Sequence, residues 1–198
     1  MAIVFPQAPA IDEPALARRL AKIAASPLSG AAGQLAGVAV DALSYTVPQE
    51  IWYSTLDALL DNRLLASARA QAWRYLLCEG DRGVGEIEIG PNSADAGRPF
   101  LAVHEGDAAQ ATIEALTFAE SLPEAAAQDL EARFLRVPAM NFAAVWLHGG
   151  AQDLLIPVIG HGDILPPRHA YTEAKVTGAL RERAERARHA PEPRRGRP

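Results

Sequence analysis

Apolar residues fill two short stretches between positions 141 and 159 with almost no charge. The first covers residues 141–148 and the second residues 154–159, and a turn containing Gly149 and Gly150 separates them. Both are apolar at successive positions, which is typical of strands that are covered on both faces. They predict two central strands of a sheet, although a helix could replace the first, because a short apolar run alone does not decide between the two.

The clearest alternation of polar and apolar residues lies at residues 84–89. Glu86 and Glu88 alternate with Ile87 and Ile89, which predicts a strand with one polar face. The two glutamates could act as paired carboxylates, but the polar face of an outer strand is the favoured interpretation. Further strands are predicted at residues 72–79, 100–104 and 134–137.

Apolar residues at helical spacing predict several helices. They cover residues 11–26, 48–60, 107–122 and 171–188, with a shorter helical fragment at 124–130. Segment 66–79 is ambiguous, because LLASARAQAW has a helix-forming composition whereas WRYLLC has the aromatic content of a strand.

These elements predict a single α+β domain over residues 1–170. An N-terminal pair of helices packs on a mainly antiparallel sheet of about five or six strands, and the helix that begins at Asp107 crosses between the first three strands and the last ones. The C-terminal helix, residues 171–190, has little apolar surface beyond Val176 and Leu180 and is predicted to be exposed. Residues 191–198, PEPRRGRP, predict a disordered basic tail.

Composition supports one domain with a sizeable core, since the chain has 198 residues of which 49% are apolar. The net charge of −5 is unevenly distributed. Residues 181–198 carry seven arginines and three glutamates, or +4, so the remainder carries −9. An acidic body argues against a nucleic-acid groove on the main domain.

The sequence also indicates a cellular compartment. The single cysteine, Cys78, excludes an internal disulfide framework and is interpreted as a small buried hydrophobe. The first residues, MAIVFPQAP, lack the basic region of a signal peptide. No window reaches the roughly eighteen apolar residues of a membrane span, so we expect a cytoplasmic location.

Histidine and aspartate residues gather around the two central strands and give two candidate sites. His148 and Asp153 can meet across the turn and are the candidate catalytic residues. His161, Asp163 and His169 follow the second strand and are the candidate metal ligands. At ~3.3 Å per residue the strand separates the two groups by roughly 20 Å, so they cannot form one site. Neither group has a signature spacing such as HExxH.

His148, Gly149 and Gly150 also resemble the HGG loop that forms the oxyanion hole of some esterases. Such enzymes carry their nucleophilic serine in a GxSxG turn between a strand and a helix, and no serine of this chain has that context. A hairpin turn is therefore the favoured interpretation.

No complete nucleophile, metal or nucleotide motif is present in the sequence. It therefore predicts a small soluble non-catalytic binding or accessory protein, with another protein as its partner and without a cofactor. The alternative is a hydrolase or metal-dependent enzyme that uses the His and Asp residues at the ends of the central strand pair. Convergence of His161, Asp163 and His169 in a concave pocket would favour the enzyme.

Overall fold

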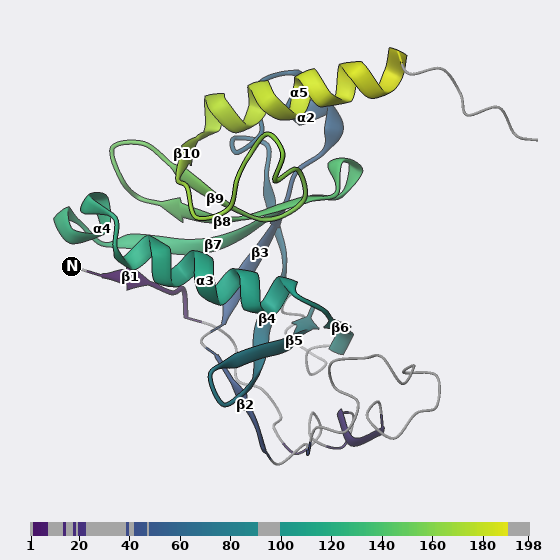
Figure 1. Cartoon of the computed structure of the whole chain (residues 1–198), viewed down its shortest axis with the longest axis vertical. Coiled ribbons are helices and arrows are strands. Elements are labelled where there is room, and N and C mark those ends of the chain that lie inside the picture. The colour runs from purple at the N-terminus through teal and green to yellow at the C-terminus, as the bar shows by residue number, and fades with distance from the viewer. Residues whose placement is uncertain are drawn as a thin grey trace, which may run out of the picture.

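The computed structural model describes residues 2–7, 14, 18, 20–22, 39, 42–46, 48–90 and 100–189. In this part of the chain ten strands form one mixed sheet, and helices pack against it (Figure 1). The predicted α+β class is confirmed. The predicted size of the sheet is wrong, because it has ten strands and not five or six.

The strands are β1 (Ile3–Val4), β2 (Leu43–Tyr45), β3 (Gln49–Tyr53), β4 (Arg69–Glu79), β5 (Arg82–Ile89), β6 (Phe100–Glu105), β7 (Leu130–Val137), β8 (Phe142–His148), β9 (Leu154–Ile159) and β10 (Tyr171–Thr172). The helices are α2 (Leu56–Leu60), α3 (Ala108–Glu120), α4 (Pro123–Ala127), the 3-10 turn η2 (Pro138–Met140) and α5 (Glu173–His189). The order across the sheet is β10-β9-β8-β7-β3-β4-β5-β6, with β1 beside β7 and β2 beside β4.

Two antiparallel halves meet at a parallel pair of strands. β3 to β6 form one half and β7 to β10 the other, and within each half neighbouring strands on the main path run antiparallel. The halves join where β3 pairs with β7 in parallel, with Ile51 opposite Phe134 and Tyr53 opposite Arg136. We call this pairing the seam.

The region 48–60 differs from the predicted helix. It begins with strand β3, and only the short helix α2 follows, capped by the Thr55 hydroxyl, which accepts from the backbone N–H of Ala58 at 3.1 Å. Ile51, Trp52 and Tyr53 are β-branched or aromatic, which favours a strand.

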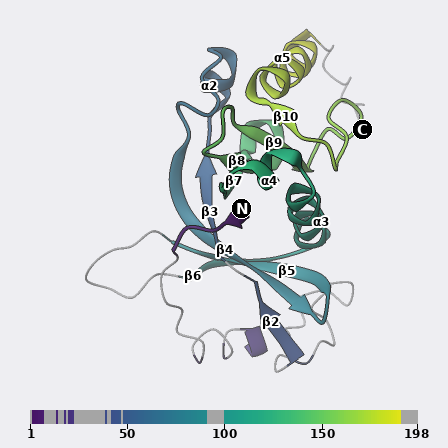
Figure 2. The same ribbon diagram turned by 90° about the vertical axis from the view of Figure 1, so that its left-hand side faces the viewer.

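Helices cover both faces of the sheet. Figure 1 shows α3 on one side of β7 to β9 and α5 with α2 on the other. In Figure 2 the sheet is strongly twisted, so that β5 runs across the direction of β3 and lies beside α3. At Gly83 of β5, an added Cβ would lie 2.7 Å from the backbone nitrogen of Gln110, so a glycine allows α3 to approach the sheet closely. α3 therefore covers one face of the sheet.

The C-terminal helix α5 is more buried than the sequence predicts. Val176 and Leu180 are fully buried and belong to an apolar cluster with Trp146 and Leu165. The apolar face of this helix has few residues, but these are enough to pack the helix against the sheet. α5 therefore belongs to the same core as the rest of the domain.

Two predicted segments lie largely or wholly outside the described residues. Of the N-terminal helix predicted at 11–26, only a few positions are described, and among these Leu20 is buried in a cluster with Tyr75 and Leu77. The predicted tail at 191–198 lies outside them. In the described part of the chain no helix is long and apolar enough to cross a membrane.

Candidate functional site

Four charged side chains form a buried network on the sheet face beneath α3. Arg74 is 0%, Glu86 3% and Glu88 7% exposed. Glu86 accepts from Nη1 of Arg74 at 2.7 Å and also from Nη2 of Arg136. Nη1 of Arg136 donates to Glu88 at 2.8 Å. The interpretation of the two glutamates as the polar face of an outer strand is therefore wrong, because α3 covers that face.

The strand register brings these residues together. β4 and β5 pair so that Arg74 lies opposite Glu88, and residues opposite each other in an antiparallel pair share one face. Across the seam, Arg136 lies opposite Tyr53. The network thus depends on both halves of the sheet.

Arg74 is enclosed on every side by the fold. Its Nε donates to Gln49 at 2.8 Å, its Nη2 donates to the Thr112 hydroxyl of α3 at 2.9 Å, and its guanidinium carbon lies 3.2 Å from the ring centroid of Phe134. Burial lowers the pKa of Arg74 to about 10, although the nearby Glu86 charge opposes this shift. Arg74 therefore stays protonated at neutral pH, and its positive charge pairs with Glu86 at the buried end of the network.

Glu88 is held by three donors. Tyr53 donates to it at 2.9 Å, Arg136 at 2.8 Å, and Nε2 of His104 lies 3.2 Å from it. Burial raises the pKa of Glu88, but the hydrogen bond and charge of Arg136 act in the opposite direction, and the pKa is lowered overall. Burial also raises the pKa of Tyr53. Glu88 is therefore ionised and Tyr53 protonated at neutral pH.

The lowered pKa of Glu88 makes its contribution to stability dependent on pH. This contribution is present above pH 4.5, the usual pKa of a glutamate, and is lost as the pH falls through the lower pKa of the folded state. We expect Glu88→Gln to be less stable than the wild type above pH 4.5, and the difference to shrink on acidification. Urea unfolding of both proteins along a pH series measures it. A difference that grows towards low pH would contradict the ion pair.

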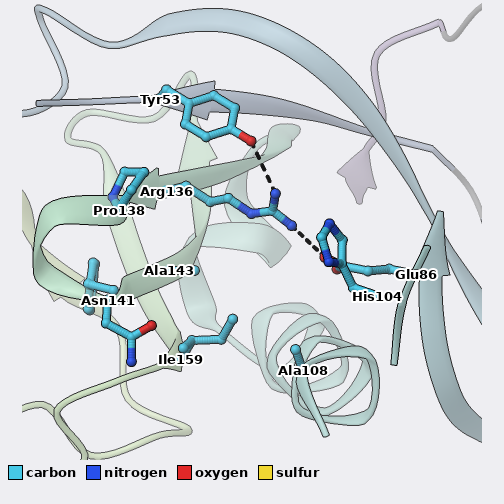
Figure 3. Close-up of a pocket in the computed structure, with 10 residues that line it drawn as sticks. Tyr53, Glu86, His104, Ala108, Arg136, Pro138, Asn141, Ala143 and Ile159 are labelled. Carbon is cyan, nitrogen blue, oxygen red and sulfur yellow. Dashed lines mark hydrogen bonds and ion pairs between the residues drawn. The ribbon is translucent and has the colours of Figure 1, made fainter. Parts of the chain in front are cut away.

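A pocket of about 440 Å³ opens beside the network, between the sheet, η2 and the start of α3. Figure 3 shows Arg136 in its centre, with Glu86 and His104 on one side and Asn141 and Ile159 on the other. The side with Asn141 and Ile159 is largely apolar. The pocket is lined by Tyr53, Glu86, His104, Ala108, Arg136, Pro138, Asn141, Phe142, Ala143 and Ile159.

Two residues with left-handed backbone lie at or next to the pocket: Asn141 lines it, and Gly160 follows Ile159, which also lines it. Asn141 has φ of 46° and Gly160 has φ of 84°. Asparagine tolerates this conformation better than most residues. At Gly160 an added Cβ would also collide with the carbonyl oxygen of Asn141. The close approach of η2 and the end of β9 therefore requires glycine at this position.

The candidate catalytic pair lies elsewhere. Nδ1 of His148 and Oδ1 of Asp153 are 2.9 Å apart across the turn, so the two residues do meet as the sequence predicts. The rings of His148 and Trp146 also pack in a T-shaped arrangement, with their centroids 5.5 Å apart. Neither member of the pair lines the pocket described above.

The three candidate metal ligands have three separate partners. Nε2 of His161 lies 2.7 Å from the carbonyl oxygen of Met140, and Nδ1 of His169 lies 3.1 Å from that of Pro167. Asp163 accepts from Nη1 of Arg183 at 2.8 Å. Within the described ranges no group of three or more His, Cys, Asp or Glu side chains could hold a metal ion.

The two arginines of the network were not among the candidate residues predicted from the sequence. Arg74 lies between Trp73 and Tyr75 and Arg136 between Leu135 and Val137, and an arginine is seldom fully buried unless it is paired. Together with the alternating glutamates, these arginines were a signal of a buried ion-pair network.

The chain matches no protein-family model, no curated protein and no solved structure, so the geometry of the pocket carries the functional argument.

Proposed function

We propose that the protein is a non-catalytic binding protein whose ligand is a small molecule with a polar head and an apolar body. The observation that carries this proposal is the pocket of about 440 Å³, which combines largely apolar walls with one firmly anchored arginine, Arg136. Small-molecule sites typically enclose roughly 300–1,000 Å³ and have mainly apolar walls with a few fixed polar groups.

The ionisable groups of the pocket favour binding over acid–base catalysis. Both oxygens of Glu86 accept hydrogen bonds from arginines. The lowered pKa of Glu88 is the opposite of what a general acid needs at neutral pH. Arg136 is fixed by Tyr53 and both glutamates, so it is already oriented before a ligand arrives. Such preorganisation strengthens binding, because little conformational freedom is lost.

A substitution that fills the pocket tests the proposal. Ala108 is the first residue of α3 and lines the pocket, so Ala108→Phe places a ring inside it without changing charge. Hexanoate, hexan-1-ol and hexanamide serve as probes, and chemical shifts of backbone amides report binding. In the wild type we expect at least one probe to shift Phe142, Ala143 and Ile159, and we expect Ala108→Phe to abolish these shifts.

The matched control is Ala174→Phe, which adds the same ring at an exposed position in the first turn of α5. This variant should bind like the wild type. The absence of any shift in the wild type, or equal shifts in Ala108→Phe, would show that the pocket is not a binding site.

A protein partner and a cytoplasmic location, both expected from the sequence, stay predictions. β6 and β10 are the two ends of the main strand path in the described sheet. Of these, β6 is the longer, so it offers more backbone to a strand added by a partner.

The alternative function, a hydrolase or metal-dependent enzyme, is supported by the 2.9 Å contact between His148 and Asp153, since a carboxylate can orient a catalytic imidazole. A rate of ester hydrolysis that falls in His148→Ala would favour this alternative.

A further inference from the structure

We propose that the head group bound in this pocket is a single carboxylate, taken by the unoccupied edge of the Arg136 guanidinium group. This inference rests on the proposed binding function and deepens it, because it names the chemical class of the ligand. It is supported by the set of hydrogen bonds that Arg136 makes, together with the N–H donors of Arg136 that have no partner among the described residues.

Arginine has five N–H donors. Arg136 uses both donors of Nη1, towards Tyr53 at 3.1 Å and Glu88 at 2.8 Å, and one donor of Nη2, towards Glu86. The N–H of Nε and the second N–H of Nη2 have no partner among the described residues. In a guanidinium group the N–H of Nε and one N–H of Nη2 project from the same edge, the edge that does not include Nη1. In Figure 3 that edge faces away from Tyr53, towards the space bounded by Ile159 and Ala108.

The acceptor oxygens of the network already have donors of their own. Each oxygen of Glu86 accepts from an arginine, and each oxygen of Glu88 accepts from Tyr53 or Arg136. The Tyr53 hydroxyl both donates to Glu88 and accepts from Arg136. The network therefore offers donors to a ligand, and the ligand's head must supply acceptors.

Geometry favours a carboxylate among the possible acceptors. Two parallel N–H groups on one guanidinium edge match the two oxygens of a carboxylate, and this bidentate pairing is stronger than a neutral hydrogen bond. An alcohol or a primary amide brings one oxygen only. The amide would also bring an NH₂ group close to the N–H donors of Arg136, and a buried donor without an acceptor is unfavourable.

Charge favours a head group with one negative charge over one with two. Arg74 and Arg136 balance Glu86 and Glu88, so the network is neutral before a ligand binds. A carboxylate adds one negative charge beside Arg136, next to the start of α3, where the helix dipole favours an anion. A phosphate dianion would add two negative charges close to two glutamates, and burying unpaired charge is costly.

The rest of the pocket suits an apolar body. Phe142 and Ala143 are buried, and Pro138 and Ile159 complete an apolar wall opposite the charged network. At the rim, Figure 3 shows the Asn141 side chain beside this wall. The expected ligand is thus a small monocarboxylate with a hydrocarbon or similar apolar chain.

Head-group discrimination in the wild-type protein is the first test and needs no variant. Hexanoate, hexan-1-ol and hexanamide share a chain length and differ at the head, and calorimetric or NMR titration gives the dissociation constant of each. We expect hexanoate to bind at least about tenfold more tightly than either neutral probe, since hydrogen bonds to charged groups contribute more than neutral ones.

Arg136→Lys is the second test. Lysine keeps the positive charge for Glu86 and Glu88 but lacks the planar pair of donors. Hexanoate should bind about tenfold more weakly to this variant, while hexan-1-ol binding should change little. The circular dichroism spectrum and urea midpoint of the variant establish that it is folded.

The outcomes separate the two proposals. Neutral probes that bind the wild type as tightly as hexanoate, with shifts at the pocket residues, would overturn the carboxylate inference and leave the binding function standing. Equal loss of hexanoate and hexan-1-ol affinity in a folded Arg136→Lys variant would also overturn it. If none of the three probes binds the wild type, the proposed function itself is wrong.

Discussion

Replacing Arg74 by methionine is expected to lower the free energy of unfolding by about 3–5 kcal/mol, the cost of removing one partner from a buried ion pair. Arg74 is fully buried, and its removal leaves one oxygen of Glu86 without its donor beneath α3. Gln49 and Thr112 lose a hydrogen-bond partner at the same time. Urea unfolding at neutral pH measures the change.

A second arginine provides the control for this prediction. Arg63 pairs with Asp61, but both side chains are more than half exposed, so Arg63→Met should change the unfolding free energy by about 0–1 kcal/mol. The double variant Arg74→Met, Glu86→Gln should be less destabilised than Arg74→Met alone, because the uncompensated carboxylate is removed as well. A single Arg74→Met variant as stable as Arg63→Met would contradict the burial of the network.

Gly160→Ala is expected to destabilise the protein by about 2–5 kcal/mol, from two sources. The left-handed backbone at φ of 84° costs a residue with a Cβ about 1–2 kcal/mol. The new Cβ would in addition push against the Asn141 carbonyl, and overpacking of this kind costs about 1–3 kcal/mol. A thermal or urea unfolding curve of the variant measures the sum.

Gly162 lies two positions further along the same loop and gives a matched control. An added Cβ at Gly162 meets nothing within 4 Å, and its φ is not left-handed. Gly162→Ala should therefore leave stability within about 0.5 kcal/mol of the wild type. Equal unfolding midpoints for the two alanine variants would show that η2 and the end of β9 do not approach as described.

Local patterns in the sequence were enough to predict the hairpins. The apolar runs at 141–148 and 154–159 correspond to β8 and β9 almost residue for residue. The contact between His148 and Asp153 was also predictable, because a short turn brings its own ends together. By contrast, Trp52 and Leu56 have a spacing that fits a helix, and the sequence alone did not show that a strand ends between them.

The size of the sheet could not be predicted in the same way. β1 and β10 have two residues each and β2 has three, too few to show a period. Strands this short form by pairing with a neighbouring strand, so their own residues do not indicate them.

Local sequence patterns did not predict the pocket, for a related reason. The strand pattern around Arg136 does not name its partners, one of which is Tyr53, 83 positions earlier in the chain. The pairing of β3 with β7 determines the charges that meet, and no periodicity within either strand encodes its partner.

The seam also bears on how the chain folds. Within each half, the strands of the β4–β5 and β8–β9 hairpins are separated by short turns, whereas pairing Tyr53 with Arg136 closes a loop of 83 positions. Closing a long loop has an entropic cost that nearby contacts do not have, so such pairings slow folding. We therefore expect the two halves to gain structure first and the seam to close late, with Arg136 joining Tyr53 and the glutamates near the end. A substitution at Arg136 should then speed unfolding more than it slows folding.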